Sequence, residues 1–279
     1  MGFENINYLN TQQQEIKQVH PLDILPSLSL ERREDILEIV EFCSRCVDRY
    51  AKEFNTQPIP QNAFFLFNGD KINTLGMYDP KTHMFGVHED ALYMPHVLIH
   101  EMIHFIAAEK LTAKSGYRYQ ITQENGDPSK MIYVAVDEGM TDLMAQEIYS
   151  LNYLKLKNFF AGRGGMERTA GEYSEETIFI QKLVEYNAII LSIQENIPQE
   201  EAHIQVWREM KRAYLSNNHT YLEDLFSLFA DTQEEEKEVR EFIKGIRPDW
   251  NQKEKTELLI KILDKKIASL HTWKNKIST

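Results

Sequence analysis

The stretch VLIHEMIHFIAAEK, residues 97–110, decides how this chain folds, because it sets two histidines and a glutamate among apolar neighbours. Its apolar residues recur with helical spacing, and Pro95 suits the first turn of a helix. We therefore expect a helix that is apolar on nearly all sides and buried in the protein. Buried polar side chains are costly unless a partner compensates them, so His100, Glu101 and His104 require one.

A metal ion is the partner that the spacing of these residues indicates. His100 and His104 are four residues apart, so their imidazoles project from one helix face and can bind one ion. Glu101 leans towards the open side of such an ion, where a carboxylate can take a proton from water. This H-E-x-x-H pattern is typical of zinc hydrolases, but a zinc site needs a third protein ligand. A third histidine six residues further on is absent, because Lys110 occupies that position.

A second pair of acidic residues lies downstream, in VDEGMTD at 136–142. Glu138 and Asp142 are four residues apart and therefore share one face of an expected helix. Asp137 is the nearest competitor to Glu138 for the role of third metal ligand. It lies about 100° round the helix from the face that Glu138 shares with Asp142, so Glu138 is preferred. Gly139, beside Glu138, is expected to let two helices approach closely.

With HEMIH at 100–104 and EGMTD at 138–142, the chain resembles the gluzincin zinc metallopeptidases, the thermolysin-like group. The resemblance covers roughly residues 75–175. It implies a zinc metalloendopeptidase with one zinc ion per chain, bound by His100, His104 and Glu138. It further implies that Asp142 hydrogen-bonds His100 and fixes its tautomer, and that Glu101 is the general base.

The same resemblance implies a donor that stabilises the tetrahedral oxyanion, supplied in this group by a Tyr or His of the C-terminal lobe. Tyr173 is preferred, because it follows a glycine-rich segment at an expected helix start and loops beside rigid elements often carry such residues. His219 and Tyr133 are the alternatives. In this group an edge strand beside the active-site helix also pairs with extended peptides, and 74–78 or 83–89 would be that strand. An ordinary strand covering the core fits these two runs equally well.

The remaining pattern divides the chain into three segments: an N-terminal extension (1–28), a mixed segment (29–150) and a helical segment (151–279). We expect an α+β fold. The resemblance makes it a zincin-like two-lobe fold, with a small sheet and the active-site helix in the mixed N-terminal lobe and a mainly helical C-terminal lobe. The expected elements are a helix from Ser29 with Cys43 and Cys46 as reduced thiols inside it, a strand at 62–67, a hairpin at 74–90, a helix from Pro128 to about 151, and helices near 175–195, 200–216, 220–230, 233–245 and 252–272.

The charge balance bounds the partners. With 31 basic and 43 acidic residues the net charge is -12, which argues against nucleic-acid and anionic-membrane binding. The resemblance to the gluzincins implies a peptide or protein substrate. No apolar run is long enough to span a bilayer, the mean hydropathy is -0.46, and the polar N-terminus lacks the layout of a secretory signal. These features predict a cytoplasmic protein, although leaderless export is compatible with them. The oligomeric state stays open.

Two alternative functions keep the metal. One is a zinc-binding scaffold or interaction protein that is proteolytically silent. The other is a leaderless effector or toxin protease, which shares the chemistry and differs in the cell where it acts.

Overall fold

The computed structural model describes residues 20, 22–68, 74–108, 116, 119–121, 130–163, 174–227, 232–246 and 253–277. Within these ranges the chain is mostly helical, with a three-stranded mixed sheet and a separate two-stranded sheet. The expected α+β class is confirmed at this level. No helix in the described ranges combines the length and the apolar character needed to cross a membrane.

The first long helix is α1 (Leu30–Ala51), as its sequence predicts. It begins where the Ser29 hydroxyl accepts a hydrogen bond from the backbone N–H of Arg32 at 3.3 Å. Two short 3₁₀ turns flank it, η1 (Leu25–Ser27) and η2 (Lys52–Phe54). Its buried face carries Ile36, Ile39, Val40, Cys43, Cys46 and Val47. Both cysteines are free thiols in the core, and burial raises the pKa of the Cys43 thiol, which suits the packing role expected of them.

The larger sheet contains β1 (Phe64–Phe67), β2 (Gly76–Asp79) and β3 (Met84–His88) in the order β1-β3-β2. Strands β2 and β3 form the expected antiparallel hairpin, whereas β1 pairs with β3 in parallel. Strand β1 begins two residues later than expected, because Gln61–Ala63 form a 3₁₀ turn, η3. A further 3₁₀ turn, η4 (Glu89–Ala91), follows β3.

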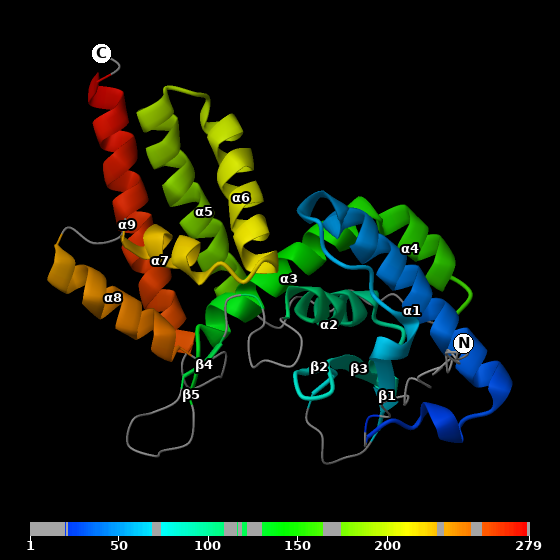
Figure 1. The fold of residues 1–279 in the computed structure, drawn as a ribbon. Helices are drawn as coiled ribbons and strands as arrows, with labels where there is room; N and C mark the ends of the chain where they lie inside the picture. Colours follow the sequence, from blue (N-terminus) through cyan, green and yellow to red (C-terminus); the bar gives the residue numbers. More distant parts are fainter. Residues whose placement is uncertain are drawn as a thin grey trace, which may run out of the picture.

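Helix α2 (Pro95–Ala107) contains the opening stretch and packs against β2 and β3 on one side and against α3 (Val134–Leu151) on the other (Figure 1). The prediction that the helix after α2 begins at Pro128 is wrong where the structure describes this segment. Lys130–Ile132 form a strand, β5, which pairs antiparallel with β4 (Tyr119–Ile121). Tyr133 then adopts a left-handed backbone conformation with φ 57°, so the helix begins only at Val134. Pro128 itself lies outside the described residues.

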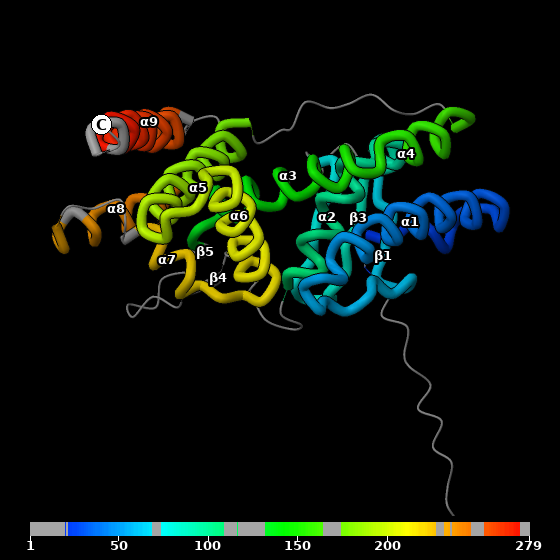
Figure 2. The backbone as a smooth tube through the Cα atoms, turned by 90° about the horizontal axis from the view of Figure 1, so that it is seen from above, coloured from blue at the N-terminus to red at the C-terminus, as the bar shows by residue number. Residues whose placement is uncertain are grey.

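Helix α3 joins two groups of elements (Figure 2). On one side of it lie α1, α2, the sheet and α4 (Tyr153–Phe160). On the other side lie helices close to the ranges expected from the sequence: α5 (Ser174–Glu195), α6 (Gln199–Leu215), α7 (His219–Ser227), α8 (Gln233–Gly245) and α9 (Lys253–Ile277). One cluster of buried apolar side chains extends from α1 to α9. The close approach expected at Gly139 is made by α5, since a Cβ there would lie 2.6 Å from the backbone oxygen of Glu176.

A polar cluster, called the clamp below, joins α1 and α6 to α3. Its members are Glu147, Tyr50, Trp207 and Lys211. Glu147 of α3 accepts hydrogen bonds from the Tyr50 hydroxyl of α1 and, at 3.0 Å, from the Trp207 indole N–H of α6. The buried Lys211 ammonium lies 3.2 Å from the same carboxylate and 4.8 Å from the Tyr50 ring centre. A buried cation surrounded by aromatic faces and a carboxylate is stabilised by both.

We expect Lys211→Ala to lower the free energy of unfolding by about 1–3 kcal/mol, because it removes the cation and leaves Glu147 partly buried without it. Urea unfolding followed by circular dichroism measures the change. Lys265→Ala, which alters an exposed lysine of α9, is the control and should change stability by less than about 0.5 kcal/mol. Equal stability of the two variants would contradict the stabilising role of the clamp.

Candidate metal centre

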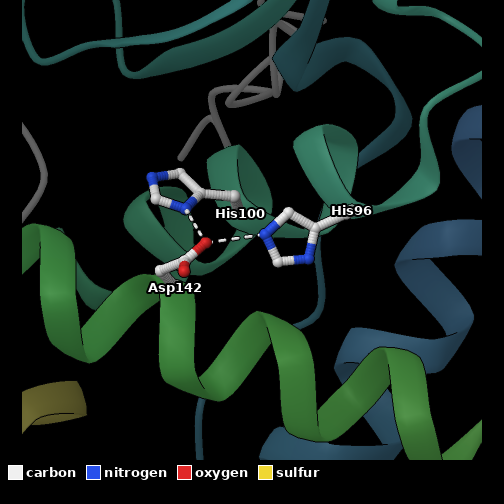
Figure 3. A group of neighbouring side chains, drawn as sticks. All are labelled: His96, His100 and Asp142. Atoms are coloured by element: carbon white, nitrogen blue, oxygen red, sulfur yellow. Dashed lines mark hydrogen bonds and ion pairs between the residues drawn. The ribbon is translucent and has the colours of Figure 1, made fainter. Parts of the chain in front are cut away.

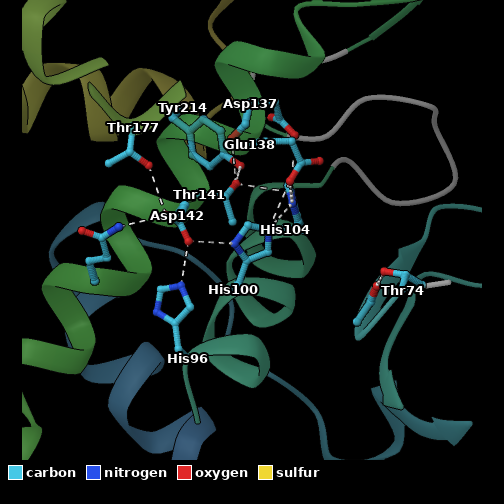
Figure 4. A network of polar contacts seen from close by, with 12 residues as sticks. Thr74, His96, His100, His104, Asp137, Glu138, Thr141, Asp142, Thr177 and Tyr214 are labelled. Carbon is cyan, nitrogen blue, oxygen red and sulfur yellow. Dashed lines mark hydrogen bonds and ion pairs between the residues drawn. The ribbon is translucent and has the colours of Figure 1, made fainter. Parts of the chain in front are cut away.

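Helices α2 and α3 bring three polar side chains to one point (Figure 4). The Nε2 atoms of His100 and His104 lie 3.1 Å apart, and the Glu138 Oε2 atom lies 3.1 Å from the first and 3.2 Å from the second. All three side chains are buried. The structure therefore brings together the three residues that the resemblance implies as ligands, and their donor atoms form a group able to hold a metal ion.

The spacing of these atoms fits a small cation. Three donors at 2.0–2.1 Å from a tetrahedral ion lie about 3.3 Å from one another, close to the separations in this group. The two imidazoles come from successive turns of α2, and the carboxylate comes from the first half of α3, so the packing of the two helices sets the geometry.

The far side of His104 fixes which of its nitrogens carries hydrogen. Thr141 donates its hydroxyl hydrogen to the backbone oxygen of Asp137 at 2.9 Å, so its oxygen accepts from the Tyr214 hydroxyl at 2.5 Å and from His104 Nδ1 at 3.4 Å. The Asp137 carboxylate lies 3.4 Å from the same Nδ1. A hydrogen on Nδ1 leaves the lone pair of Nε2 pointing at the centre of the group.

The far side of His100 faces Asp142 in the same way. Asp142 Oδ1 lies 3.7 Å from His100 Nδ1 and accepts a hydrogen bond from His96 Nε2 at 2.6 Å (Figure 3). Because carboxylates only accept, Asp142 favours the hydrogen on His100 Nδ1 and the lone pair on Nε2. Three electron-pair donors therefore face one another at about 3 Å, an arrangement that needs a positive charge between them.

The surroundings also shift the pKa values of His100 and Asp142. Burial alone would lower the pKa of His100, but its interactions with Asp142 and Glu138 and the charge of Glu101 raise it to about 10. Burial alone would raise the pKa of Asp142, but its interactions with His100 and His96 hold it well below its ordinary value. Both shifts have the same direction in electrostatic terms, because these surroundings favour positive charge where the side chains meet.

Glu101 lies between His100 and strand β2. Its charge acts on the His100 imidazole, and its side chain is buried directly under Gly76, where a Cβ atom would lie 2.6 Å from Glu101 Oε1. Gly76 therefore provides the space that this carboxylate occupies. Glu101 is buried, which agrees with the prediction that this helix is apolar on nearly all sides and has no exposed face.

Of the three candidates for the oxyanion donor, the structure describes Tyr133 and His219. Tyr173 lies outside the described residues. Tyr133 is buried and its hydroxyl donates to Glu223 of α7 at 3.4 Å, with its ring against Phe226, so these contacts direct it towards α7. His219 is partly buried at the first residue of α7.

Sequence reasoning missed several polar residues around the group. His96 had a signal, because it precedes His100 by four residues and so lies on the same helix face. Thr141 stands inside VDEGMTD and was not singled out. Tyr214 of α6, Thr177 of α5 and Gln146 of α3 had none, because their roles depend on contacts between distant segments.

His96, His100 and Asp142 form a second group of potential ligands (Figure 3). Its distances differ from those of the first group. His96 Nε2 and Asp142 Oδ1 are 2.6 Å apart, which is a hydrogen bond and too short for two ligands of one tetrahedral ion. The group of His100, His104 and Glu138 is therefore the better candidate for a metal site. Comparison of the chain with protein-family models, curated proteins and solved structures gives no match.

Proposed function

We propose that this protein is a zinc-dependent peptidase of the gluzincin type, with one zinc ion held by His100, His104 and Glu138. The observation that carries the proposal is the group of three buried potential ligand atoms that lie 3.1–3.2 Å from one another. Two imidazoles and one carboxylate are the ligand set of catalytic zinc sites that keep an open position. The finer fold assignment, a zincin-like two-lobe arrangement, is part of this proposal and is supported by the placement of α2 between the sheet and α3.

When bound, zinc supplies a Lewis acid that polarises a peptide carbonyl and acidifies a water molecule. Glu101 takes the proton of the attacking water and later gives it to the leaving amine nitrogen. Asp142 orients the His100 imidazole, and Asp137 with Thr141 orients that of His104, which keeps both Nε2 lone pairs available.

Strand β2 is the proposed binding edge for an extended peptide. In the described sheet it pairs with β3 on one side only. The His88 N–H donates to the Leu75 oxygen at 2.8 Å, so in this register Leu75, Met77 and Asp79 are the residues that bond to β3. Because antiparallel pairing alternates, the backbone groups of Gly76 and Tyr78 face away from β3, where a substrate strand can add. Gly76 stands directly above Glu101, so a peptide on this edge passes the general base.

A cleavage assay tests the proposal. We expect zinc-loaded protein to cut a mixture of unstructured random peptides into fragments that mass spectrometry identifies. Removal of the metal with a chelator should stop cleavage, and one equivalent of zinc should restore it. Zinc-loaded protein that binds the metal at His100, His104 and Glu138 but cleaves no peptide would support the scaffold alternative.

We expect Gly76→Ala to lower kcat/KM about 10- to 100-fold while zinc content stays at one per chain. The added Cβ would lie 2.6 Å from Glu101 Oε1 and 2.7 Å from its Cγ, so the carboxylate must leave its position. The matched control is Gly162→Ala, since a Cβ at Gly162 has no atom within 4 Å. Unchanged cleavage by Gly76→Ala would contradict the role given to Gly76 and the position given to Glu101.

A further inference from the structure

The Asp142 carboxylate is held from three helices. Its Oδ2 accepts hydrogen bonds from Thr177 of α5 at 3.1 Å and from Gln146 of α3 at 2.9 Å. Its Oδ1 accepts from His96 of α2 at 2.6 Å and lies 3.7 Å from Nδ1 of His100 (Figures 3 and 4). The carboxylate is almost fully buried, at 1% exposure, so each of these donors replaces a water molecule.

His96 makes the shortest of these contacts. It contacts Asp142 Oδ1, the same oxygen that lies beside His100, a proposed zinc ligand. The Thr177 and Gln146 contacts hold the other oxygen and leave Oδ1 to the two imidazoles. His96 therefore fixes where Oδ1 stands relative to His100 Nδ1. Without His96, the hydrogen bonds to Oδ2 would remain, but only the 3.7 Å approach of His100 would hold Oδ1. Rotation about the Cβ–Cγ bond would then be less restricted.

We propose that His96 is a positioning residue of the metal centre. It acts through Asp142: it holds Oδ1 beside His100 Nδ1, which keeps the hydrogen of His100 on Nδ1 and the lone pair of Nε2 towards the metal. This inference rests on the proposed function, because it requires that His100 bind zinc. Groups that orient a metal-binding histidine typically contribute 10- to 100-fold to metal affinity.

The test measures zinc dissociation constants by competition with a chromophoric chelator. His96→Ala should weaken zinc binding about 10- to 100-fold, and His96→Gln, whose side-chain amide nitrogen can donate from nearly the same place as Nε2, should recover most of the loss. His271→Ala, at an exposed histidine of α9, is the control and should bind zinc as the unaltered protein does. Thermal melting of the metal-free variants checks that each is folded.

The visible spectrum of cobalt-loaded protein reports on positioning rather than on stability. In cobalt-loaded protein, the visible absorption of His96→Ala should differ from that of the unaltered protein, and His96→Gln should resemble the latter.

Zinc binding by His96→Ala as tight as that of the unaltered protein would overturn this inference and leave the proposed function standing. The inference also fails if His96→Gln is as weak as His96→Ala, because the effect then comes from lost packing. Failure of the unaltered protein to bind zinc would instead overturn the proposed function, and this inference with it.

Discussion

Glu138→Ala is expected to lose zinc, with a dissociation constant raised more than about 100-fold, because two imidazoles alone do not complete a protein zinc site. Glu138 Oε2 lies 3.1 Å and 3.2 Å from the two Nε2 atoms and contributes the only negative charge among the three proposed ligands. Elemental analysis after dialysis against zinc-free buffer should give about one zinc per chain in the unaltered protein and nearly none in the variant.

Glu201→Ala is the matched control for this measurement, since Glu201 is an exposed carboxylate in the first turn of α6. It should retain its zinc. Full zinc retention by Glu138→Ala would mean that another residue is the third ligand, and Asp137 is the nearest acidic neighbour, 3.4 Å from His104 Nδ1.

Glu101→Gln is expected to lower kcat for peptide cleavage about 10²- to 10⁴-fold and to leave zinc content unchanged. The amide has nearly the shape of the carboxylate and fits under Gly76, but it does not accept a proton from water at neutral pH. The measurement is cleavage of a fluorogenic peptide chosen from the fragments of the random mixture, with zinc measured on the same sample.

Zinc content and cleavage rate together distinguish the peptidase from the scaffold. A Glu101→Gln protein that keeps zinc and loses cleavage behaves as a peptidase whose general base has been removed. Cleavage at the original rate would rule out Glu101 as the base. If the unaltered protein binds zinc but cleaves nothing, and Glu101→Gln still performs the biological role, the scaffold alternative is favoured.

Much of the fold follows from local sequence. Helix α1 begins at Ser29 and α2 at Pro95, because a capping hydroxyl and an N-terminal proline act within one turn of the residues that they stabilise. The hairpin of β2 and β3 is predictable for the same reason. Strand β5 was not predicted, because three residues give too short a pattern and its pairing with β4 depends on a segment about ten residues away.

The candidate site, like the fold, could be predicted only in part from local sequence. The spacing of four residues within each pair predicts that His100 shares a helix face with His104, and Glu138 with Asp142. The roles of Glu138 and Asp142 came from the resemblance to the gluzincins. That the two faces meet depends on the packing of α2 against α3, which the sequence does not contain directly. Tyr214 and Thr177 reach the site from α6 and α5, and only tertiary structure brings them to Thr141 and Asp142.

The most direct measurement is anomalous X-ray diffraction at the zinc absorption edge, on crystals of the protein with one equivalent of zinc. The account predicts one strong anomalous peak at 2.0–2.1 Å from the Nε2 atoms of His100 and His104, with Glu138 as the third protein ligand. A peak between His96 and Asp142, or no ordered zinc at either place, would contradict it.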